Sequence, residues 1–274
     1  MQQKKFAVIG HPIGHSLSKV MHTRVFQELD LPHTYDAIDI APENLEHFIK
    51  TTDLDGINVT IPHKVAVMQH MNNLDKSARD IHAVNTVQFG ETRTGYNTDG
   101  VGFSKSLEEE TINPEGRNTL VVGAGGVSRA ILVSLLNCNA NVTLTNRTKQ
   151  KAIDLVSELN AQDKIKIIDY TTESLKQELQ DTYLIVNTTS IGMHPYQDAS
   201  PIPKELLKPT HIIFDAVYNP LETKLIQDAK EKGCKTISGV NMLVHQGAQS
   251  LRIWLGIEPP IQSMKDAVLS ALLN

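Results

Sequence analysis

Residues 119–129 read Thr-Leu-Val-Val-Gly-Ala-Gly-Gly-Val-Ser-Arg, and this stretch limits most strongly what the chain can fold into. A short apolar run ends at Gly123, and apolar residues then recur at helical spacing as far as Leu136. The pattern predicts a strand, a tight turn and a helix. Gly123 would let the chain turn, and Gly125 would let a pyrophosphate approach bare backbone at the positive end of the helix. The stretch therefore indicates a dinucleotide-binding turn in an α/β fold.

The motif departs from the usual G-x-G-x-x-G pattern, because Ser128 replaces its third glycine. Serine is small enough for the helix to pack closely on the sheet, and both the strand and the helix that the motif requires are predicted around it. A glycine-rich turn in some other kind of α/β protein remains the alternative.

The end of the next expected strand, residues 141–145, bears on which nucleotide would bind. An Asp or Glu about 20 residues after the first glycine binds the ribose 2′-hydroxyl of NAD. Here no acidic residue occurs between residues 123 and 153. The basic residues that follow the strand are Arg147, Lys149 and Lys151. A solvated basic loop is one interpretation, but at this position Asn146, Arg147 and Thr148 favour NADP over NAD.

Composition excludes several classes of protein. The 274 residues suffice for one large or two medium domains, and a net charge of −5 provides no basic face for nucleic acid and no polybasic membrane patch. The chain shows no signal-like apolar core and no run long enough to span a bilayer, so we expect a cytoplasmic protein. The two cysteines form no CxxC motif and the eleven histidines no metal-binding frame, so we expect no metal site.

Alternating strand-like and helix-like segments predict two α/β domains. Those of the first hundred residues are 6–9, 20–29, 34–40, 45–49 and 57–60, and they indicate a mainly parallel sheet. A charged connection, residues 108–118, separates them from six expected strands near residues 120, 142, 165, 183, 211 and 236. Six strands with intervening helices predict a doubly wound sheet. Two terminal helices, 242–255 and 264–272, follow without a strand between them.

Binding residues of such sheets lie in loops at the carboxyl ends of the strands. After the first strand, Ser16 and Ser18 could bind a polar substrate such as a carboxylate, although Ser18 could also be a helix N-cap. After the strand 57–60, Pro62 predicts a helix that runs to about Met71. Lys64 would lie in its first turn, against the helix dipole, which favours a role in a cleft over that of a solvated surface lysine.

Two further polar residues interrupt apolar patterns. Asn85 lies in the expected strand 83–87, where a buried amide needs partners and a substrate hydroxyl is one candidate. Asp99 precedes the helical pattern of Val101, Phe103 and Leu107, so helix capping competes with a catalytic role.

Taken together, these segments resemble one family, the shikimate dehydrogenases, in an order and spacing that extend over nearly the whole chain. The segments are His15-Ser-Leu-Ser18, Asn58-Val-Thr-Ile-Pro-His-Lys64, Ala83-Val-Asn-Thr86, Tyr96-Asn-Thr-Asp-Gly100, Gly123-Ala-Gly-Gly126, Asn146-Arg-Thr148, Asn187-Thr-Thr-Ser190, Asp215-Ala-Val-Tyr218 and Met242-Leu-Val-His-Gln246. Departures from the family pattern are Lys19, Thr23 and His82, which flank the presumed ligands and bear on local loop shape.

The resemblance implies a fold and a reaction. Residues 1–103 and 241–274 would form an α/β substrate-binding domain with a mainly parallel sheet, to which the terminal helices return. Residues 104–240 would form a doubly wound, Rossmann-type NADP-binding domain. The reaction would be the reversible, NADPH-dependent reduction of 3-dehydroshikimate to shikimate, in the pathway to chorismate and the aromatic amino acids.

The resemblance also assigns residues. Lys64 and Asp99 would be the catalytic pair. The substrate would be bound by Ser16, Ser18, Thr60, Lys64, Asn85, Asp99, Tyr218 and Gln246. The cofactor would be bound by Gly123, Ala124, Gly125, Gly126, Val127, Ser128, Asn146, Arg147, Thr148, Lys151, Thr188, Ala216 and Gly239.

Two other functions remain open from the sequence. A quinate/shikimate dehydrogenase would use a broader range of substrates and cofactors, but the missing acid after the second strand and the small Ser16 speak against it. A non-catalytic NADP-binding regulatory protein would have no need for both Lys64 and Asp99. The expected partners are a small-molecule substrate and, at most, a second copy of the chain, as a monomer or homodimer.

Overall fold

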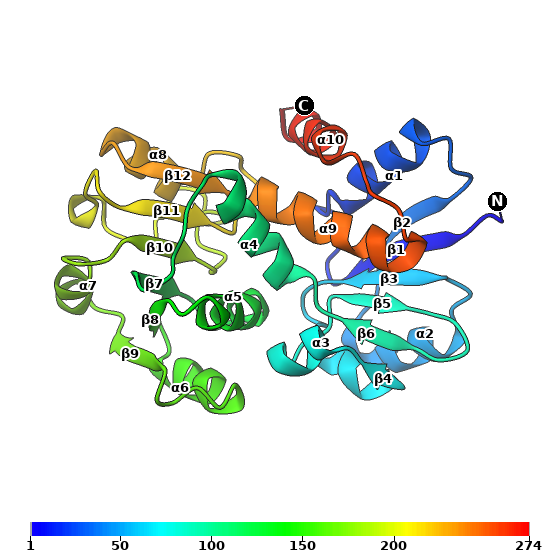
Figure 1. Cartoon of the computed structure of the whole chain (residues 1–274), viewed down its shortest axis with the longest axis horizontal. Coiled ribbons are helices and arrows are strands. Elements are labelled where there is room, and N and C mark those ends of the chain that lie inside the picture. The colour runs from blue at the N-terminus through cyan, green and yellow to red at the C-terminus, as the bar shows by residue number, and fades with distance from the viewer. Residues whose placement is uncertain (1, 274) are drawn as a thin grey trace. The chain divides into compact units, whose positions relative to one another are not determined.

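The computed structural model describes residues 2–273, and the chain divides into two compact units. Unit 1 comprises Met1–Gly102 and Leu243–Asn274, and unit 2 comprises Phe103–Met242. Each unit is built around one six-stranded sheet (Figure 1). Among the described residues, no helix has the length and apolar character needed to cross a membrane.

Unit 1 contains a mixed sheet, sheet A, with strand order β2-β1-β3-β5-β6-β4. The elements of its first segment are β1 (Lys5–Gly10), α1 (Ser18–Glu28), β2 (Thr34–Asp39), η1 (Pro42–Asn44), α2 (Leu45–Thr51), β3 (Gly56–Val59), η2 (Ala66–His70), β4 (Asn73–Leu74), α3 (Lys76–Ile81), β5 (Thr86–Gln88), β6 (Thr94–Tyr96) and the start of α4 (Asp99–Glu109). The predicted β-α-β alternation is confirmed up to β3, since β1 pairs in parallel with β2 and β3. β5 then pairs antiparallel with both β3 and β6, so the polar loops after β3 and before β5 lie at one edge.

Apolar residues of β1 face two different layers of unit 1, as the two-residue period of a strand requires. Ala7 and Ile9 join the core beneath α2. Phe6 faces the other layer, where it contacts Phe26 of α1 and stacks on Trp254 with 4.7 Å between ring centroids. Trp254 lies in α9 (Gly239–Leu255), and the last helix, α10 (Ile261–Leu273), packs on α1. The two terminal helices predicted from the sequence are thereby confirmed.

Unit 2 contains an entirely parallel sheet, sheet B, with strand order β12-β11-β10-β7-β8-β9. Its elements are β7 (Asn118–Val122), α5 (Gly126–Asn137), β8 (Asn141–Asn146), α6 (Lys149–Glu158), β9 (Ile165–Asp169), α7 (Thr172–Glu178), β10 (Leu184–Asn187), η3 (Lys204–Leu206), β11 (Ile212–Asp215), α8 (Lys224–Glu231) and β12 (Lys235–Ser238). All six predicted strands are present, and the order is that of a doubly wound sheet.

Sheet B is buried on both faces. Val121 of β7 packs with α5 and α6, whereas its neighbours Leu120 and Val122 pack with α7 and α8. A strand covered on both sides reads as a continuous apolar run, which is why residues 120–122 show no alternation. The strand and helix expected around the glycine-rich turn are therefore confirmed as β7 and α5.

The prediction of a helix that starts at Pro62 is wrong. Residues 61–65 form turns, and the short 3₁₀ helix η2 begins only at Ala66. An α-helix would need the Lys64 carbonyl to accept a bond from the Met68 N–H group, but this carbonyl accepts one from Val84 at 2.7 Å instead. Lys64 therefore does not lie in a helical first turn, and the dipole argument for its role does not apply.

Three other local expectations need correction. Ser18 is the first residue of α1 and not its N-cap, which is Leu17. The strand expected at residues 83–87 begins only at Thr86, so Asn85 precedes it. Asp99 does not precede α4 but is its first residue, and its carboxylate bonds to Lys64 and Asn85.

Candidate active site

In unit 1, Lys64 and Asp99 form a buried ion pair. Lys64 Nζ lies 2.5 Å from Asp99 Oδ2, and only 11% and 6% of the two side chains are exposed. Lys64 is fixed by its carbonyl bond to Val84. Asp99 is fixed at the start of α4, where a negative charge is favoured and where its N–H group donates to Asn97 Oδ1 at 3.0 Å. Two residues that are 35 positions apart in the sequence thus place an ammonium and a carboxylate together.

Asn85 holds the other carboxylate oxygen of this pair. Its Nδ2 atom donates to Asp99 Oδ1 and to Thr98 Oγ1, both at 2.9 Å, and its Oδ1 atom accepts from the Thr98 N–H group at 2.8 Å. The buried amide predicted to need partners therefore finds them within the protein. Sequence reasoning missed Thr98, which the structure shows to be buried.

Gln246 of α9 joins the same group, although it comes from the end of the chain. Its Oε1 atom lies 3.5 Å from Asn85 Nδ2 and 3.5 Å from Thr98 Oγ1, and its Nε2 atom donates to the Leu243 carbonyl at 2.8 Å. The structure thus brings together four of the predicted site residues, which are Lys64, Asn85, Asp99 and Gln246.

The loops that follow β1 and β3 lie against each other at one edge of sheet A. The N–H group of His11 donates to the Ile61 carbonyl at 3.0 Å, and that of Thr60 donates to the Ile9 carbonyl at 2.9 Å. A Cβ atom at Gly10 would lie 2.5 Å from Thr60 Cγ2, so glycine is needed for this approach. Thr60 therefore lies beside the loop that carries the two predicted serines.

Ser16 and Ser18 are joined to each other, because Ser16 Oγ accepts from the Ser18 N–H group at 3.4 Å. The Ser18 carbonyl accepts from the buried His22 ring at 2.8 Å, and that ring stacks on Tyr35 with 4.1 Å between centroids. Burial lowers the pKa of His22 to about 4, so its ring is neutral near pH 7. Sequence reasoning missed His22 and Tyr35 as supports of the serine loop.

In unit 2, the glycine-rich turn has the geometry that the motif predicts. Gly123 has a φ of +114°, and a Cβ atom there would lie 2.5 Å from Thr188 Oγ1. Around the position of a Cβ atom on Gly125 there is open space, and α5 begins at the next residue. The turn thus offers bare backbone and a helix N-terminus, which suits a phosphate group.

Ser128 closes this turn by hydrogen bonds that a third glycine could not make. Its Oγ atom accepts from the Gly125 N–H group at 3.0 Å and lies 2.6 Å from Thr188 Oγ1. Thr188 Oγ1 donates in turn to the Val122 carbonyl at 2.8 Å, so the Ser128 hydroxyl donates to Thr188. The departure from the glycine pattern is therefore part of the structure of the turn.

The basic loop lies at the same edge of sheet B, because β8 pairs with β7 and the Gly123 N–H group donates to the Thr145 carbonyl at 2.8 Å. Asn146 Nδ2 donates to the Thr148 carbonyl at 2.9 Å and shapes the loop. Lys149 pairs with Asp169 at 2.9 Å. Arg147 and Lys151 are exposed, and within residues 2–273 neither side chain makes a hydrogen bond or ion pair. Both cations are therefore available to an anionic group such as a 2′-phosphate.

The remaining predicted residues of unit 2 lie at the ends of β10, β11 and β12. Thr188 follows β10 and forms a wall of the glycine-rich turn. Ala216 follows β11, and a Cβ atom at Gly239 would lie 2.4 Å from its carbonyl oxygen. Tyr218 is two residues further on, and burial raises the pKa of its phenol.

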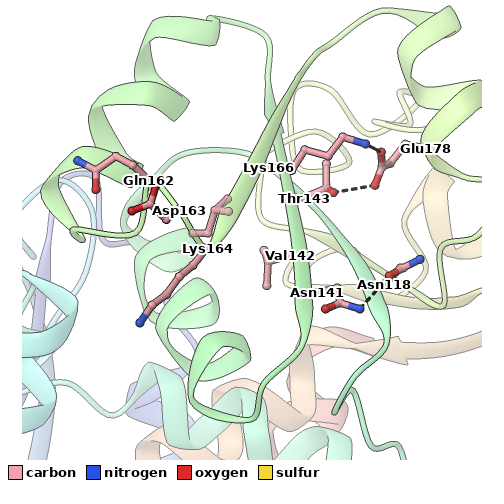
Figure 2. A pocket seen from close by; sticks show the side chains of 10 residues that line it. Asn118, Asn141, Val142, Thr143, Gln162, Asp163, Lys164, Lys166 and Glu178 are labelled. Atoms are coloured by element: carbon pink, nitrogen blue, oxygen red, sulfur yellow. Dashed lines mark hydrogen bonds and ion pairs between the residues drawn. The ribbon is translucent and has the colours of Figure 1, made fainter.

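A pocket of about 500 Å³ opens at the opposite edge of sheet B, where β7, β8 and β9 begin (Figure 2). Its polar side chains bond to one another: Thr143 Oγ1 donates to Glu178 at 2.7 Å, and Lys166 pairs with Glu178 at 2.6 Å (Figure 2). None of the predicted site residues lines it. Ligands of doubly wound sheets bind at the carboxyl ends of the strands, so this pocket does not indicate the active site. Among the described residues, no group of three or more His, Cys, Asp or Glu side chains is placed to hold a metal ion.

Comparisons with known proteins identify the family to which the chain is similar. Three family models match: "Shikimate dehydrogenase substrate binding domain" over residues 8–87, "Shikimate / quinate 5-dehydrogenase" over residues 106–200, and "Shikimate 5'-dehydrogenase C-terminal domain" over residues 239–269. The shikimate dehydrogenase (NADP(+)) of Methanosarcina barkeri is 42% identical over 97% of this chain and 98% of its own length. The shikimate dehydrogenase (NADP(+)) of Methanocaldococcus jannaschii is 40% identical over 98% of this chain and 97% of its own length.

Solved structures show the same fold. A crystal structure of a shikimate dehydrogenase in complex with NADP⁺ matches with a TM-score of 0.92 and 38% identity, over 98% of this chain and 96% of that chain. The shikimate 5-dehydrogenase of Thermus thermophilus, in complex with NADP(H) and shikimate, matches with a TM-score of 0.87 and 35% identity. The match covers 98% of this chain and 100% of that chain. Full-length identity of this level, together with the three family models, shows that the chain belongs to the shikimate dehydrogenase family.

Proposed function

We propose that this chain catalyses the reversible, NADPH-dependent reduction of 3-dehydroshikimate to shikimate, in the pathway to chorismate and the aromatic amino acids. The observation that carries the proposal is the buried pair of Lys64 and Asp99, with Asn85 bonded to its second carboxylate oxygen. We assign substrate binding to residues 1–103 and 241–274 and NADP binding to residues 104–240. The enzyme is proposed to act in the cytoplasm, as a monomer or a homodimer.

Bound NADPH supplies the hydride that reduces the ketone. The carbonyl oxygen then becomes a developing alkoxide, which needs a positive neighbour and a proton. The Lys64 ammonium provides both, since it is nearly buried and is held by one partner carboxylate at 2.5 Å. Asp99 keeps the ammonium in place and accepts a bond from a substrate hydroxyl.

We assign the remaining contacts to substrate on the basis of side-chain chemistry and position. The hydroxyls of Ser16 and Thr60, in adjoining loops, and of Ser18, at the start of α1, suit a carboxylate or a ring hydroxyl. Asn85 and Gln246 present amide groups beside Asp99. Tyr218 is also assigned to substrate, because its phenol suits a polar ring substituent.

We assign the cofactor to the glycine-rich turn and the basic loop of unit 2. Gly123, Ala124, Gly125, Gly126, Val127 and Ser128 would hold the pyrophosphate, which the open space at Gly125 and the start of α5 support. Asn146, Arg147, Thr148 and Lys151 would hold the 2′-phosphate. Thr188, Ala216 and Gly239 would line the nicotinamide half.

The decisive experiment follows NADPH formation spectrophotometrically with shikimate and NADP, beside quinate and NAD as controls. Lys64→Ala is expected to lower kcat by about 10²–10⁴, the usual effect of removing a general acid or base. Lys76→Ala is the matched control, since Lys76 is an exposed lysine of the same unit that pairs with Asp80. Near-full turnover by Lys64→Ala would remove Lys64 from the mechanism.

The wild-type results separate the alternatives. Comparable rates with quinate and NAD would identify a quinate/shikimate dehydrogenase with broad cofactor use. Binding of NADPH without any turnover of shikimate would identify a regulatory protein.

A further inference from the structure

At the end of β11, Asp215 is completely buried and is bonded on three sides. Its Oδ1 atom accepts from Asn187 Nδ2 at 2.9 Å and from the Val217 N–H group at 3.0 Å. Its Oδ2 atom accepts from Thr223 Oγ1 at 2.6 Å. The exposed fractions of Asn187, Asp215 and Thr223 are 0%, 0% and 1%. We call these three side chains the Asp215 network.

A buried carboxylate without a cationic partner is costly to place in a protein core. Burial raises the pKa of Asp215 to about 6, although the bonds from Thr223, Val217 and Asn187 oppose that rise. An apolar residue could fill the same space without this cost. The Asp215 network is therefore a candidate for a role beyond packing.

The Asn187 end of the network fixes the loop that follows β10. Asn187 Oδ1 accepts from the Thr189 N–H group at 3.0 Å and from Thr189 Oγ1 at 2.7 Å. Its Nδ2 atom also lies 3.3 Å from the Ile191 carbonyl. Thr188 lies between Asn187, the last residue of β10, and Thr189, and it lines the glycine-rich turn at Gly123.

The Thr223 end fixes the same loop from its other side. Thr223 is the N-cap of α8, where its hydroxyl accepts from the Ile226 N–H group at 3.2 Å. Gly192 has a φ of +101°, and a Cβ atom there would lie 3.2 Å from Thr223 Cβ. The loop therefore rests on Thr223 at its centre and on Asn187 at its start.

The Val217 bond fixes the segment after β11. It holds the backbone on the far side of Ala216, whose carbonyl lies against Gly239 at the start of α9. A single carboxylate is thus bonded to Asn187 and Val217, the sequence neighbours of Thr188 and Ala216, two of the residues assigned above to NADP.

We infer that Asn187, Asp215 and Thr223 are positioning residues for NADP binding, which act by fixing the loops that carry Thr188 and Ala216. The inference rests on the cofactor site proposed above, and none of the three side chains needs to touch the cofactor. A purely structural role would change stability and leave the dissociation constant of NADPH unchanged.

The first test compares three threonine variants by titration of NADPH fluorescence. Thr223→Val removes the hydroxyl but keeps the shape, and Thr223→Ser restores the hydroxyl. Thr171→Val is the matched control, because Thr171 caps α7 of the same unit by accepting from Ser174 and lies outside the network. Loss of a hydrogen bond to a buried charge corresponds to about ten-fold or more in an equilibrium constant. We therefore expect Thr223→Val to bind NADPH about ten-fold more weakly, and the other two variants to bind it as the wild type does.

The second test remains informative if Thr223→Val fails to fold. Asn187→Asp places a second carboxylate where an N–H group now lies 2.9 Å from Asp215 Oδ1, so we expect weak NADPH binding. In the double variant Asn187→Asp/Asp215→Asn the amide and the carboxylate exchange places, which restores one charge and the bond between them. NADPH affinity should recover at least in part relative to Asn187→Asp.

Wild-type affinity in Thr223→Val, equal losses in Thr171→Val, or no recovery in the double variant would each overturn the inference. Because the titration needs no turnover, its result stays separate from the test of function. A wild-type chain that binds NADPH but does not oxidise shikimate would refute the proposed reaction and still allow this comparison.

Discussion

Two glycines of one turn are predicted to serve different purposes, which substitution by alanine can separate. Gly123 has a φ of +114°, whereas Gly125 has an ordinary φ of −105°. A Cβ atom at Gly123 would lie 2.5 Å from Thr188 Oγ1, and one at Gly125 would meet nothing within 4 Å. Gly123→Ala should therefore destabilise unit 2, and Gly125→Ala should impair only the binding of NADP.

The magnitudes follow from these geometries. A non-glycine residue in a sparsely populated backbone region costs about 1–3 kcal/mol, and the contact with Thr188 adds to it. For Gly123→Ala we expect a loss of about 3 kcal/mol in unfolding free energy, or roughly 10 °C in Tm for a domain of this size. Gly125→Ala should be neutral or stabilising by about 0.4–1 kcal/mol, because alanine restricts the unfolded chain. Its methyl group would occupy the space assigned to the pyrophosphate, and we expect the Kd for NADPH to rise about ten-fold, or about 1.4 kcal/mol.

The assay combines urea unfolding in the absence of nucleotide with titration of NADPH fluorescence. The reasoning about Gly123 is refuted if Gly123→Ala unfolds at the urea concentration of the wild type. Wild-type affinity in Gly125→Ala would show that the pyrophosphate does not approach this part of the turn.

Three further predictions address other parts of the molecule. Arg147→Ala should raise the KM for NADPH far more than that for NADH, while Lys149→Ala, whose lysine already pairs with Asp169, should have a smaller effect; equal changes for both nucleotides would rule out the 2′-phosphate assignment. The pKa of Asp215 is about 6 in the folded chain against an ordinary value of 3.8, so its contribution to stability is complete below pH 3.8 and is lost as pH rises through 6. Asp215→Asn should remove this pH dependence, which amounts to about 3 kcal/mol of unfolding free energy for a pKa difference of about two. Parallel profiles of unfolding free energy for variant and wild type between pH 4 and about 8 would contradict this prediction. Gly56→Ala would bring a Cβ atom to 2.5 Å from the Trp254 ring, so we expect a Tm several degrees lower. An unchanged Tm would show that α9, which carries Trp254, moves away without cost.

The sequence predicted the elements whose signal is local. The run Leu120 to Val122, the glycines that follow and the apolar helix pattern specify β7, the turn and α5 within twenty residues. All six strands of unit 2 were found for the same reason, since short apolar runs between turns mark buried parallel strands.

Errors arose where distant residues compete for a local group. The expected helix after Pro62 is absent because the Lys64 carbonyl bonds to Val84, twenty residues away in the sequence. Asp99 was a plausible N-cap, but Lys64 and Asn85 take its carboxylate. Neither partner can be identified from the residues around Asp99, because only the folded sheet brings them near.

The roles of the site residues were predicted from resemblance more than from pattern. Asn85 looked like a ligand for a hydroxyl, and the structure shows an amide already bonded to Thr98 and Asp99. Ser128 looked like a tolerated replacement for glycine, and its hydroxyl in fact bonds to Gly125 and Thr188. Hydrogen bonds of this kind depend on side-chain directions that spacing alone does not provide.

The stacking of Trp254 on Phe6 affects the order in which the chain can fold during translation. Trp254 also donates its indole N–H group to the Val87 carbonyl at 3.0 Å, so a residue made long after the strands of sheet A packs on that sheet. Residues up to 102 leave the ribosome first; they include Phe26 and His33, which contact the Phe6 ring, but not Trp254, which stacks on it. Unit 2 is contiguous in sequence and contains all its own strands, so it can fold before Trp254 is made and packs on Phe6. Unit 1 reaches its final packing only when α9 and α10 have been translated, which makes the first segment the one most in need of protection from aggregation.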